Sequence, residues 1–147
     1  MTNDVNLQNF LNVFTDVGFR FTKLIVWDKQ NKITNMYYMN QVEYILFMTK
    51  GLAKKINNCG TSNLISINNV KNKLHGHPTE KPVELMEILI ENSSNEGDLV
   101  LDPFVGVGAT AIACKNLNRN FIGCELDKTF YDTTMERLKE NNMDFFV

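Results

Sequence analysis

LDPFVGVGAT (101–110) and FIGCELD (121–127) are the two segments that decide the fold class of this 147-residue chain. An apolar run ends at Asp102, and Gly106 and Gly108 follow it within a few residues. Glycine permits a tight turn and lets a ligand approach the main chain where a β-carbon would collide. This order predicts a strand, a turn and a helix, with a ligand lying against the turn.

The segments on either side of this turn have the order strand, helix, strand, helix. We predict strands at 99–102 and 121–125, and helices at 109–117 and 128–142. Short, almost wholly apolar strands are typical of a parallel sheet that is covered on both faces. The predicted fold class is therefore α/β, with the repeating unit of a doubly wound sheet.

Glu125 stands nineteen residues after Gly106 (125 − 106), at the predicted end of the second strand. An acidic side chain there can accept hydrogen bonds from both hydroxyls of an adenosine ribose. The pattern therefore predicts a nucleoside cofactor. A phosphate-binding loop is disfavoured because no Lys-Ser or Lys-Thr pair follows the glycines, and Ala109 and Thr110 stand where an NAD site prefers a third glycine. An NAD-binding oxidoreductase fragment stays open as a rival, which cofactor titration would decide.

The first third of the chain has the pattern of a helix followed by two strands. A helix is predicted at 6–17, with Gly18 placed to end it. A buried strand at 24–27, a polar loop at 29–40 and a second strand at 42–51 follow. The two strands are expected to pair as a hairpin with a long loop.

The middle of the chain combines low predictability with a concentration of positive charge. Residues 52–76 are expected to be mostly loop, and an amphipathic helix is predicted from Pro82 to about residue 92. Residues 50–81 hold six lysines and one glutamate, a net charge of +5, whereas residues 82–147 hold five basic and twelve acidic residues, a net of −7. This asymmetry favours a local positive face, although a solvated lysine-rich loop is the simpler explanation.

Other classes of protein are excluded or disfavoured by simple features. No run of 18 apolar residues and no amino-terminal secretion signal is present, so we expect a cytoplasmic protein without a membrane span. The three cysteines are odd in number and fit no zinc pattern, so we expect buried free thiols; they are Cys59, Cys114 and Cys124. His75 and His77 have no further ligand at suitable spacing, and we predict no metal site.

Several motifs in one order resemble those of the DNA adenine-N6 and cytosine-N4 methyltransferases. These motifs are HPTEKPVELMEILI (77–90), DPFVGVGAT (102–110) and FIGCELD (121–127), with LIVWDK (24–29) and VEYILFMTKG (42–51) resembling the paired strands before the target-recognition region. The position of the HPTEKP motif directly before the cofactor strand is similar to the β-class circular order. The resemblance covers roughly residues 16–140.

This resemblance implies an incomplete doubly wound, Rossmann-like methyltransferase fold with S-adenosyl-L-methionine as cofactor. It implies that Asp102 binds the methionine ammonium, that Glu125 binds the ribose and that Leu126 lies beside the adenine. Phe104, next to Pro103, is implied to pack against the cofactor, and Gly106 and Gly108 to form the close turn. Thr79 and Lys81 are implied to lie near the methionine carboxylate. Without the motifs, Lys81 would be interpreted as a surface lysine at a helix start and Phe104 as a core aromatic.

Residues 52–76 occupy the position of the family's target-recognition region. Four lysines there are candidates for neutralising phosphates of double-stranded DNA, namely Lys54, Lys55, Lys71 and Lys73. Within a single partial methyltransferase domain at 1–147, we therefore expect a helix and strand pair at 1–51, a recognition loop at 52–76 and the cofactor-binding part at 77–147.

The family does its chemistry with a D-P-P-Y or S-P-P-Y segment, and no Pro-Pro occurs among Pro78, Pro82 and Pro103. We therefore expect no catalytic residue in this chain. The strand at 99–102 and the hairpin at 23–50 are then expected to have open edges, which recruit partners. The leading prediction is a subunit or fragment of an adenine-N6 DNA methyltransferase, of the restriction-modification type, completed by a partner or by self-association. The rival is a non-catalytic cofactor- or DNA-binding regulator.

Overall fold

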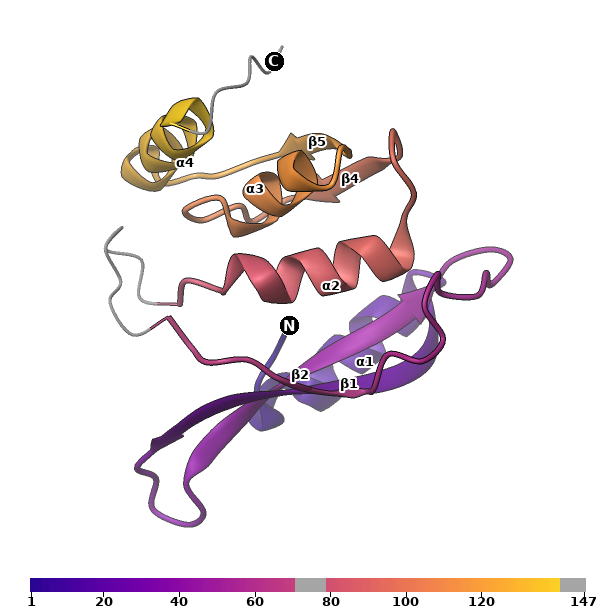
Figure 1. The fold of residues 1–147 in the computed structure, drawn as a ribbon. Helices are drawn as coiled ribbons and strands as arrows, with labels where there is room; N and C mark the ends of the chain where they lie inside the picture. Colours follow the sequence, from indigo (N-terminus) through magenta and orange to yellow (C-terminus); the bar gives the residue numbers. More distant parts are fainter. Residues whose placement is uncertain (71–78, 141–147) are drawn as a thin grey trace. The chain divides into compact units, whose positions relative to one another are not determined.

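The computed structural model describes residues 1–70 and 79–140, and the chain divides into two compact units, Met1–Asn69 and Val70–Val147. Each unit has its own sheet and is described by itself (Figure 1). The elements run in the order α1 (Asp4–Asp16), β1 (Arg20–Ile33), β2 (Asn40–Thr49), β3 (Leu64–Ser66), α2 (Val83–Ser93), β4 (Leu99–Asp102), α3 (Ala109–Asn116), β5 (Asn120–Gly123) and α4 (Lys128–Glu140).

Helix α1 opens the first unit and is confirmed close to its predicted bounds. The Asn3 side chain accepts a hydrogen bond from the backbone N–H of Asn6, which satisfies one free donor of the first turn. Gly18, with φ of +91°, follows the end of the helix, where a left-handed residue is favourable. No residue of α1 is buried, and Val5 and Val13 are 79% and 61% exposed.

The sheet of the first unit has the strand order β2-β1-β3. β1 and β2 form the predicted antiparallel hairpin, and β3 pairs parallel to β1 through Val26 and Trp27. The prediction of a polar loop beginning at residue 29 is wrong, because β1 continues to Ile33. The prediction of an open edge on the hairpin is wrong for β1, because β3 occupies that edge. β3 arises from the apolar cluster at 64–67, within a segment that was expected to be mostly loop.

The core of the first unit forms around Trp27. This side chain is fully buried, and its indole N–H donates to the carbonyl of Ile67 at 2.9 Å. Ile45 and Ile65 are also buried and come from the strands on either side of β1. A buried indole needs a partner for its N–H, and the segment just after β3 supplies it.

The second unit contains the predicted order of strand, helix, strand and helix. β4 and β5 are parallel, with Leu99 opposite Asn120 and Asp102 opposite Gly123. The strand pair, α3 and α4 are therefore confirmed with small shifts of their ends. Figure 1 shows α3 lying across the β4–β5 pair, with α4 following β5. One cluster of the core consists of Ala111, Ile112 and Leu138, against which Val83 and Phe121 pack, and Leu85 and Cys114 are fully buried as well.

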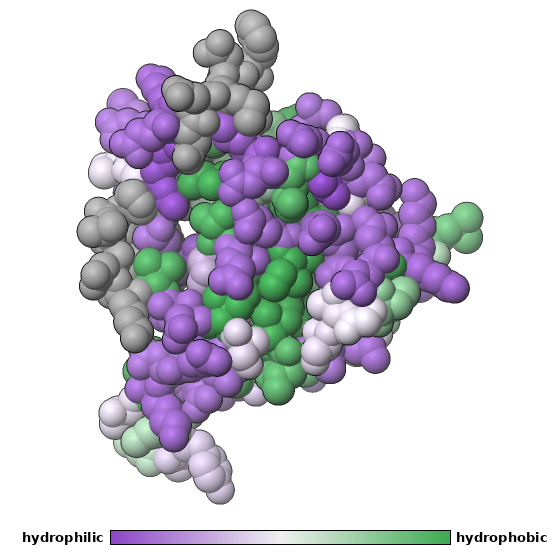
Figure 2. Space-filling view, in the orientation of Figure 1, coloured by the Kyte–Doolittle hydropathy of each residue, from purple (hydrophilic) through white to green (hydrophobic). Residues whose placement is uncertain are grey.

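One face of the β4–β5 sheet is apolar and exposed. Leu99, Leu101 and Ile122 are 61%, 65% and 52% exposed, whereas their strand neighbours Val100 and Phe121 are half-buried. The prediction that both faces are covered is wrong for the residues that the structure describes. On the other side of this sheet, where α3 lies in front of β4 and β5, the space-filling view shows hydrophobic residues exposed among hydrophilic ones (Figure 2).

The three cysteines are free, but only Cys114 is buried. The expectation of burial is wrong for Cys59 and Cys124, which are exposed. Burial raises the pKa of the Cys114 thiol to about 11, which keeps it protonated and unreactive at neutral pH. Within the described ranges, no helix has the length and apolar character needed to cross a membrane.

Candidate functional site

The turn between β4 and α3 has the conformation that its glycines predict. Gly106 and Gly108 have φ of +58° and +87°, values that other residues rarely adopt. Gly108 is also the residue that precedes the first turn of α3. A β-carbon at Gly108 would lie 2.8 Å from Cγ2 of Thr134, so the position requires glycine for space as well as for conformation.

Asp102 lies at the end of β4, and its carboxylate organises the turn. Oδ1 accepts from the backbone N–H of Phe104 at 2.9 Å, and Oδ2 accepts from the Thr110 hydroxyl at 2.6 Å. Thr110 was not assigned a role from the sequence, although it stands inside the motif. Each carboxylate oxygen keeps a second lone pair, so Asp102 can still accept hydrogen bonds from a ligand cation.

Glu125 lies two residues beyond the end of β5 and contacts the same turn. Its Oε2 accepts from the backbone N–H of Gly106 at 2.7 Å, and its Oε1 accepts from that of Asp127 at 2.9 Å. The hydrogen bond from Asp127, helped by that from Gly106, lowers the pKa of Glu125. A carboxylate therefore stands on each side of the turn, Asp102 at the end of β4 and Glu125 after β5.

The apolar residues predicted for the site are strongly exposed. Phe104 is 84% exposed, Leu126 is fully exposed, and Pro103 is exposed as well. The alternative interpretation of Phe104 as a core aromatic is therefore wrong. Large apolar side chains in this state offer surface that a planar apolar ligand can cover.

Thr79 and Lys81 lie just before α2, on either side of the buried Glu80. Arg137 of α4 links this segment to the turn, because its Nη1 is 3.2 Å from Oε1 of Glu80 and also donates to the carbonyl of Val107. Burial lowers the pKa of Arg137, while the adjacent Glu80 opposes that shift. No local feature of the sequence indicates this contact, because Arg137 is one charged residue among several on an amphipathic helix.

The candidate DNA-binding lysines are only partly described. Lys54 and Lys55 are exposed in the irregular segment between β2 and β3. Lys71 and Lys73 lie outside the described residues, as do His75 and His77. Among the residues that the structure describes, no group of three potential metal ligands occurs.

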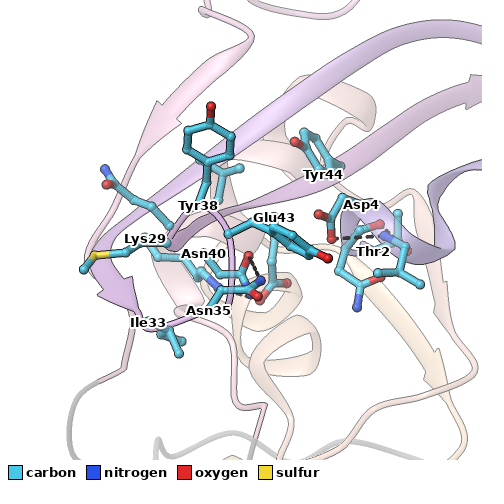
Figure 3. Close-up of a pocket in the computed structure, with 15 residues that line it drawn as sticks. Thr2, Asp4, Lys29, Ile33, Asn35, Tyr38, Asn40, Glu43 and Tyr44 are labelled. Atoms are coloured by element: carbon cyan, nitrogen blue, oxygen red, sulfur yellow. Dashed lines mark hydrogen bonds and ion pairs between the residues drawn. The ribbon is translucent and has the colours of Figure 1, made fainter.

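A pocket of about 590 Å³ lies in the first unit at the end of the β1–β2 hairpin (Figure 3). Its lining includes the ion pair of Lys29 with Glu43, at 3.6 Å, and the hydrogen bond from Asn35 to Asn40, at 3.2 Å. None of the residues predicted to bind a cofactor lines this pocket.

Comparison with protein families gives a match that covers most of the chain. The family N6_N4_Mtase, described as DNA methylase, matches residues 2–136. Among curated proteins, the chain is 32% identical over 143 residues to "Type II methyltransferase M2.DpnII" of Streptococcus pneumoniae, covering 85% of this chain and 53% of that protein. The chain spans about half the length of the curated relatives that it matches across most of its residues.

Solved structures give the same result for the fold. The crystal structure of the M1.HpyAVI–SAM complex matches with a TM-score of 0.77 and 33% identity, covering 92% of this chain and 71% of that one. PvuII DNA methyltransferase, a cytosine-N4-specific protein, matches with a TM-score of 0.80 over 95% of this chain and 58% of its own, but at 20% identity it supports the fold alone. The predicted fold class, a partial Rossmann-like methyltransferase fold, is confirmed.

Proposed function

Since this chain belongs to the N6_N4_Mtase family of DNA methylases, we propose that it is the S-adenosylmethionine-binding part of an amino-group DNA methyltransferase. The observation that carries the proposal is the pair of carboxylates, Asp102 and Glu125, fixed on a glycine turn at the ends of two parallel strands. Ligands of open α/β sheets bind at this end of the strands.

The side chains at the turn fit this cofactor in charge and in shape. S-adenosylmethionine carries an ammonium group, a ribose diol and an adenine ring. Asp102 offers an anionic acceptor for the ammonium, and Glu125 offers one for the diol. Both are already held in place by hydrogen bonds from the turn, so little ordering is left for the moment of binding.

The remaining contacts follow from the same placement. We propose that Phe104 and Leu126 cover the adenine, since both are apolar and exposed. The ammonium of Lys81 and the hydroxyl of Thr79 would hold the methionine carboxylate. When bound, the cofactor supplies a sulfonium methyl group for direct transfer to an exocyclic amino nitrogen. These residues bind and orient the cofactor, and positioning is their contribution to the rate.

The proposed substrate is double-stranded DNA, with adenine N6 as the methyl acceptor. On this proposal residues 77–147 hold the cofactor, and residues 52–76 lie against DNA. Lys54 and Lys55 would neutralise phosphates and give affinity without sequence preference. The support for this part is the family membership together with the cluster of positive charge in residues 50–81.

We further propose that additional polypeptide bearing a D-P-P-Y segment completes the site. The apolar face formed by Leu99, Leu101 and Ile122 is the surface that such a polypeptide would cover. β4 has a neighbour on one side only among the described residues, so a further strand can pair with its other edge. A partner chain and a longer version of this chain are the candidates that could carry the segment; a second copy lacks it and could only cover the apolar face.

Calorimetry tests the cofactor proposal directly. We expect the folded chain, with any partner that it needs, to bind S-adenosylmethionine and not NAD. Glu125→Gln should weaken binding by about tenfold or more, because a hydrogen bond to a charged acceptor is replaced by a neutral one. Glu96→Gln removes an exposed carboxylate of the same unit and serves as the control. Absence of heat with S-adenosylmethionine would contradict the proposal.

Methyl transfer tests the need for completion. The purified chain should transfer no methyl group to DNA alone and should do so when a D-P-P-Y-bearing polypeptide of the family is added. Leu101→Glu should abolish this complementation while the free chain stays folded, since the side chain is exposed. Methyl transfer by the chain alone would overturn the proposal that further polypeptide supplies the catalytic segment.

A further inference from the structure

The turn at 103–108 depends on helix α4 for its shape. The carbonyl of Gly106 accepts from the Thr134 hydroxyl at 3.0 Å, and the carbonyl of Val107 accepts from Arg137. Thr134 and Arg137 are three residues apart and therefore lie on the same face of the helix. A turn with two glycines has unusual conformational freedom, so contacts that fix its carbonyls select one conformation from many.

Arg137 also fixes the segment before α2. The Arg137 and Glu80 side chains are 14% and 5% exposed, and the ion pair joins Nη1 to Oε1 at 3.2 Å. The other oxygen of Glu80, Oε2, is buried without a hydrogen-bond partner among the described residues. Glu80 therefore depends strongly on Arg137, because loss of the guanidinium would leave a buried carboxylate without its ion-pair partner.

We propose that Arg137 is a positioning residue that joins the glycine turn to the segment 79–81 and keeps both in one geometry before any ligand binds. Glu80 lies between Thr79 and Lys81, so its position sets where those two side chains begin. The planar guanidinium suits this role, because it presents several donors in a rigid arrangement that a lysine ammonium lacks. The inference rests on the proposed function, since the two joined segments are the proposed binding sites of one cofactor.

The positioning role predicts a local effect, which separates it from a merely structural one. In Arg137→Gln we expect hydrogen exchange to accelerate at the backbone amides of 104–108 and 79–81, while the β4 and β5 amides keep their protection. S-adenosylmethionine binding should weaken by roughly tenfold or more, because the turn and the segment 79–81 must then be ordered when the cofactor binds. Lys139→Gln removes an exposed positive charge from the same helix and should change neither quantity.

Two further variants keep the inference open to contradiction. Glu80→Gln retains an acceptor for Arg137 and leaves the Val107 contact intact, so exchange should accelerate at the amides of 79–81 and much less in the turn. Arg137→Lys keeps the charge and one donor, so it should fold and bind with intermediate affinity; it replaces Arg137→Gln if that variant does not fold.

The inference is overturned if turn exchange is unchanged in the Arg137 variants, or if exchange rises equally throughout the second unit. It is also overturned if Arg137→Lys binds S-adenosylmethionine as tightly as the unaltered chain. If the unaltered chain binds no S-adenosylmethionine, the proposed function is wrong. The hydrogen-exchange measurements would then still test the role of Arg137, because they need no ligand.

Discussion

The two sheets of this molecule differ in how many neighbouring strands β1 and β4 have and in how well the apolar side chains of these strands are buried. In the first unit, β1 lies between β2 and β3, and its Trp27 side chain is fully buried. Among the described residues of the second unit, β4 has one partner strand, β5, and Leu99 and Leu101 are more than half exposed. Two parallel strands alone form a marginal sheet, and here α3 covers only one face.

The proposed cofactor site therefore belongs to the less complete of the two sheets, the β4–β5 pair. The turn carrying Asp102 and Gly106 starts from β4, which has one exposed apolar face and, in the described part of the unit, an edge without a neighbouring strand. The β2-β1-β3 sheet gains its stability from contacts within residues 1–69. Binding of further polypeptide is therefore expected to stabilise the second unit far more than the first.

The largest effect on stability is expected from Trp27→Ala. Removing a fully buried aromatic side chain typically lowers the free energy of unfolding by about 3–5 kcal/mol, and the Ile67 carbonyl also loses its donor. Urea unfolding followed by circular dichroism measures this change in the free energy of unfolding. Leu101→Ala, at an exposed position of β4, should cost about 0.5 kcal/mol or less. Equal costs for both variants would contradict the contrast between the two sheets.

A second comparison lies within the second unit. Gly108→Ala should destabilise by about 2–4 kcal/mol, because the left-handed backbone is strained for alanine and the new methyl meets Thr134. Gly97→Ala has the same kind of backbone, with φ of +79°, but apart from its chain neighbours no atom of the described residues lies within 4 Å of the added carbon. It should cost only about 1 kcal/mol. Thermal unfolding of both variants isolates the contact with α4.

The exposed face gives a small effect on the chain alone. Leu101→Glu should change its free energy of unfolding by about 0.5 kcal/mol or less, since the side chain is already in contact with solvent. Association that covers this face should be lost, because a carboxylate would be buried without a partner. Light scattering of the mass in solution, with and without added partner, distinguishes the two effects. A large loss of stability in the isolated chain would show that the face is already covered.

The smallest effect is expected from pH. The lowered pKa of Glu125, caused first by the Asp127 amide, means that its carboxylate stabilises the fold above the ordinary value of 4.5. This contribution is lost as pH falls through the still lower pKa of the folded state. The difference in urea midpoint between the unaltered chain and Glu125→Gln should therefore be constant near neutral pH and shrink in acid. A difference that grows on acidification would reverse the sign of the shift.

Most of the second unit could be predicted from the sequence, because its signals are local. The apolar runs, the paired glycines and the acidic residue after the next strand fixed β4, the turn and β5 within a few residues. Thr110 and Arg137 were not assigned, because their roles depend on which side chains meet in space. An arginine on an amphipathic helix has no local mark that separates a surface residue from a buried link.

The first unit was harder to predict where polar residues form strands. β1 extends through the polar stretch after Asp28 to Ile33, which pairs with Asn40 of β2 beyond an irregularity in the register. The carbonyl of Lys29 accepts from the backbone N–H of Asn69, another contact between residues far apart in sequence. β3 has only three residues and pairs with a strand far away in sequence, so its existence depends on a long-range contact. The candidate site residues stay predictions, as their ligand contacts await binding measurements.

Lys115 gives the supporting helix a built-in reporter. Its side chain is buried, and its ammonium donates to the carbonyl of Leu138 at 2.7 Å, near the last turn of α4. An amine-acylating reagent would label the exposed lysines at once and Lys115 only when α4 detaches. The labelling rate of Lys115 would therefore report how often α4 separates from α3.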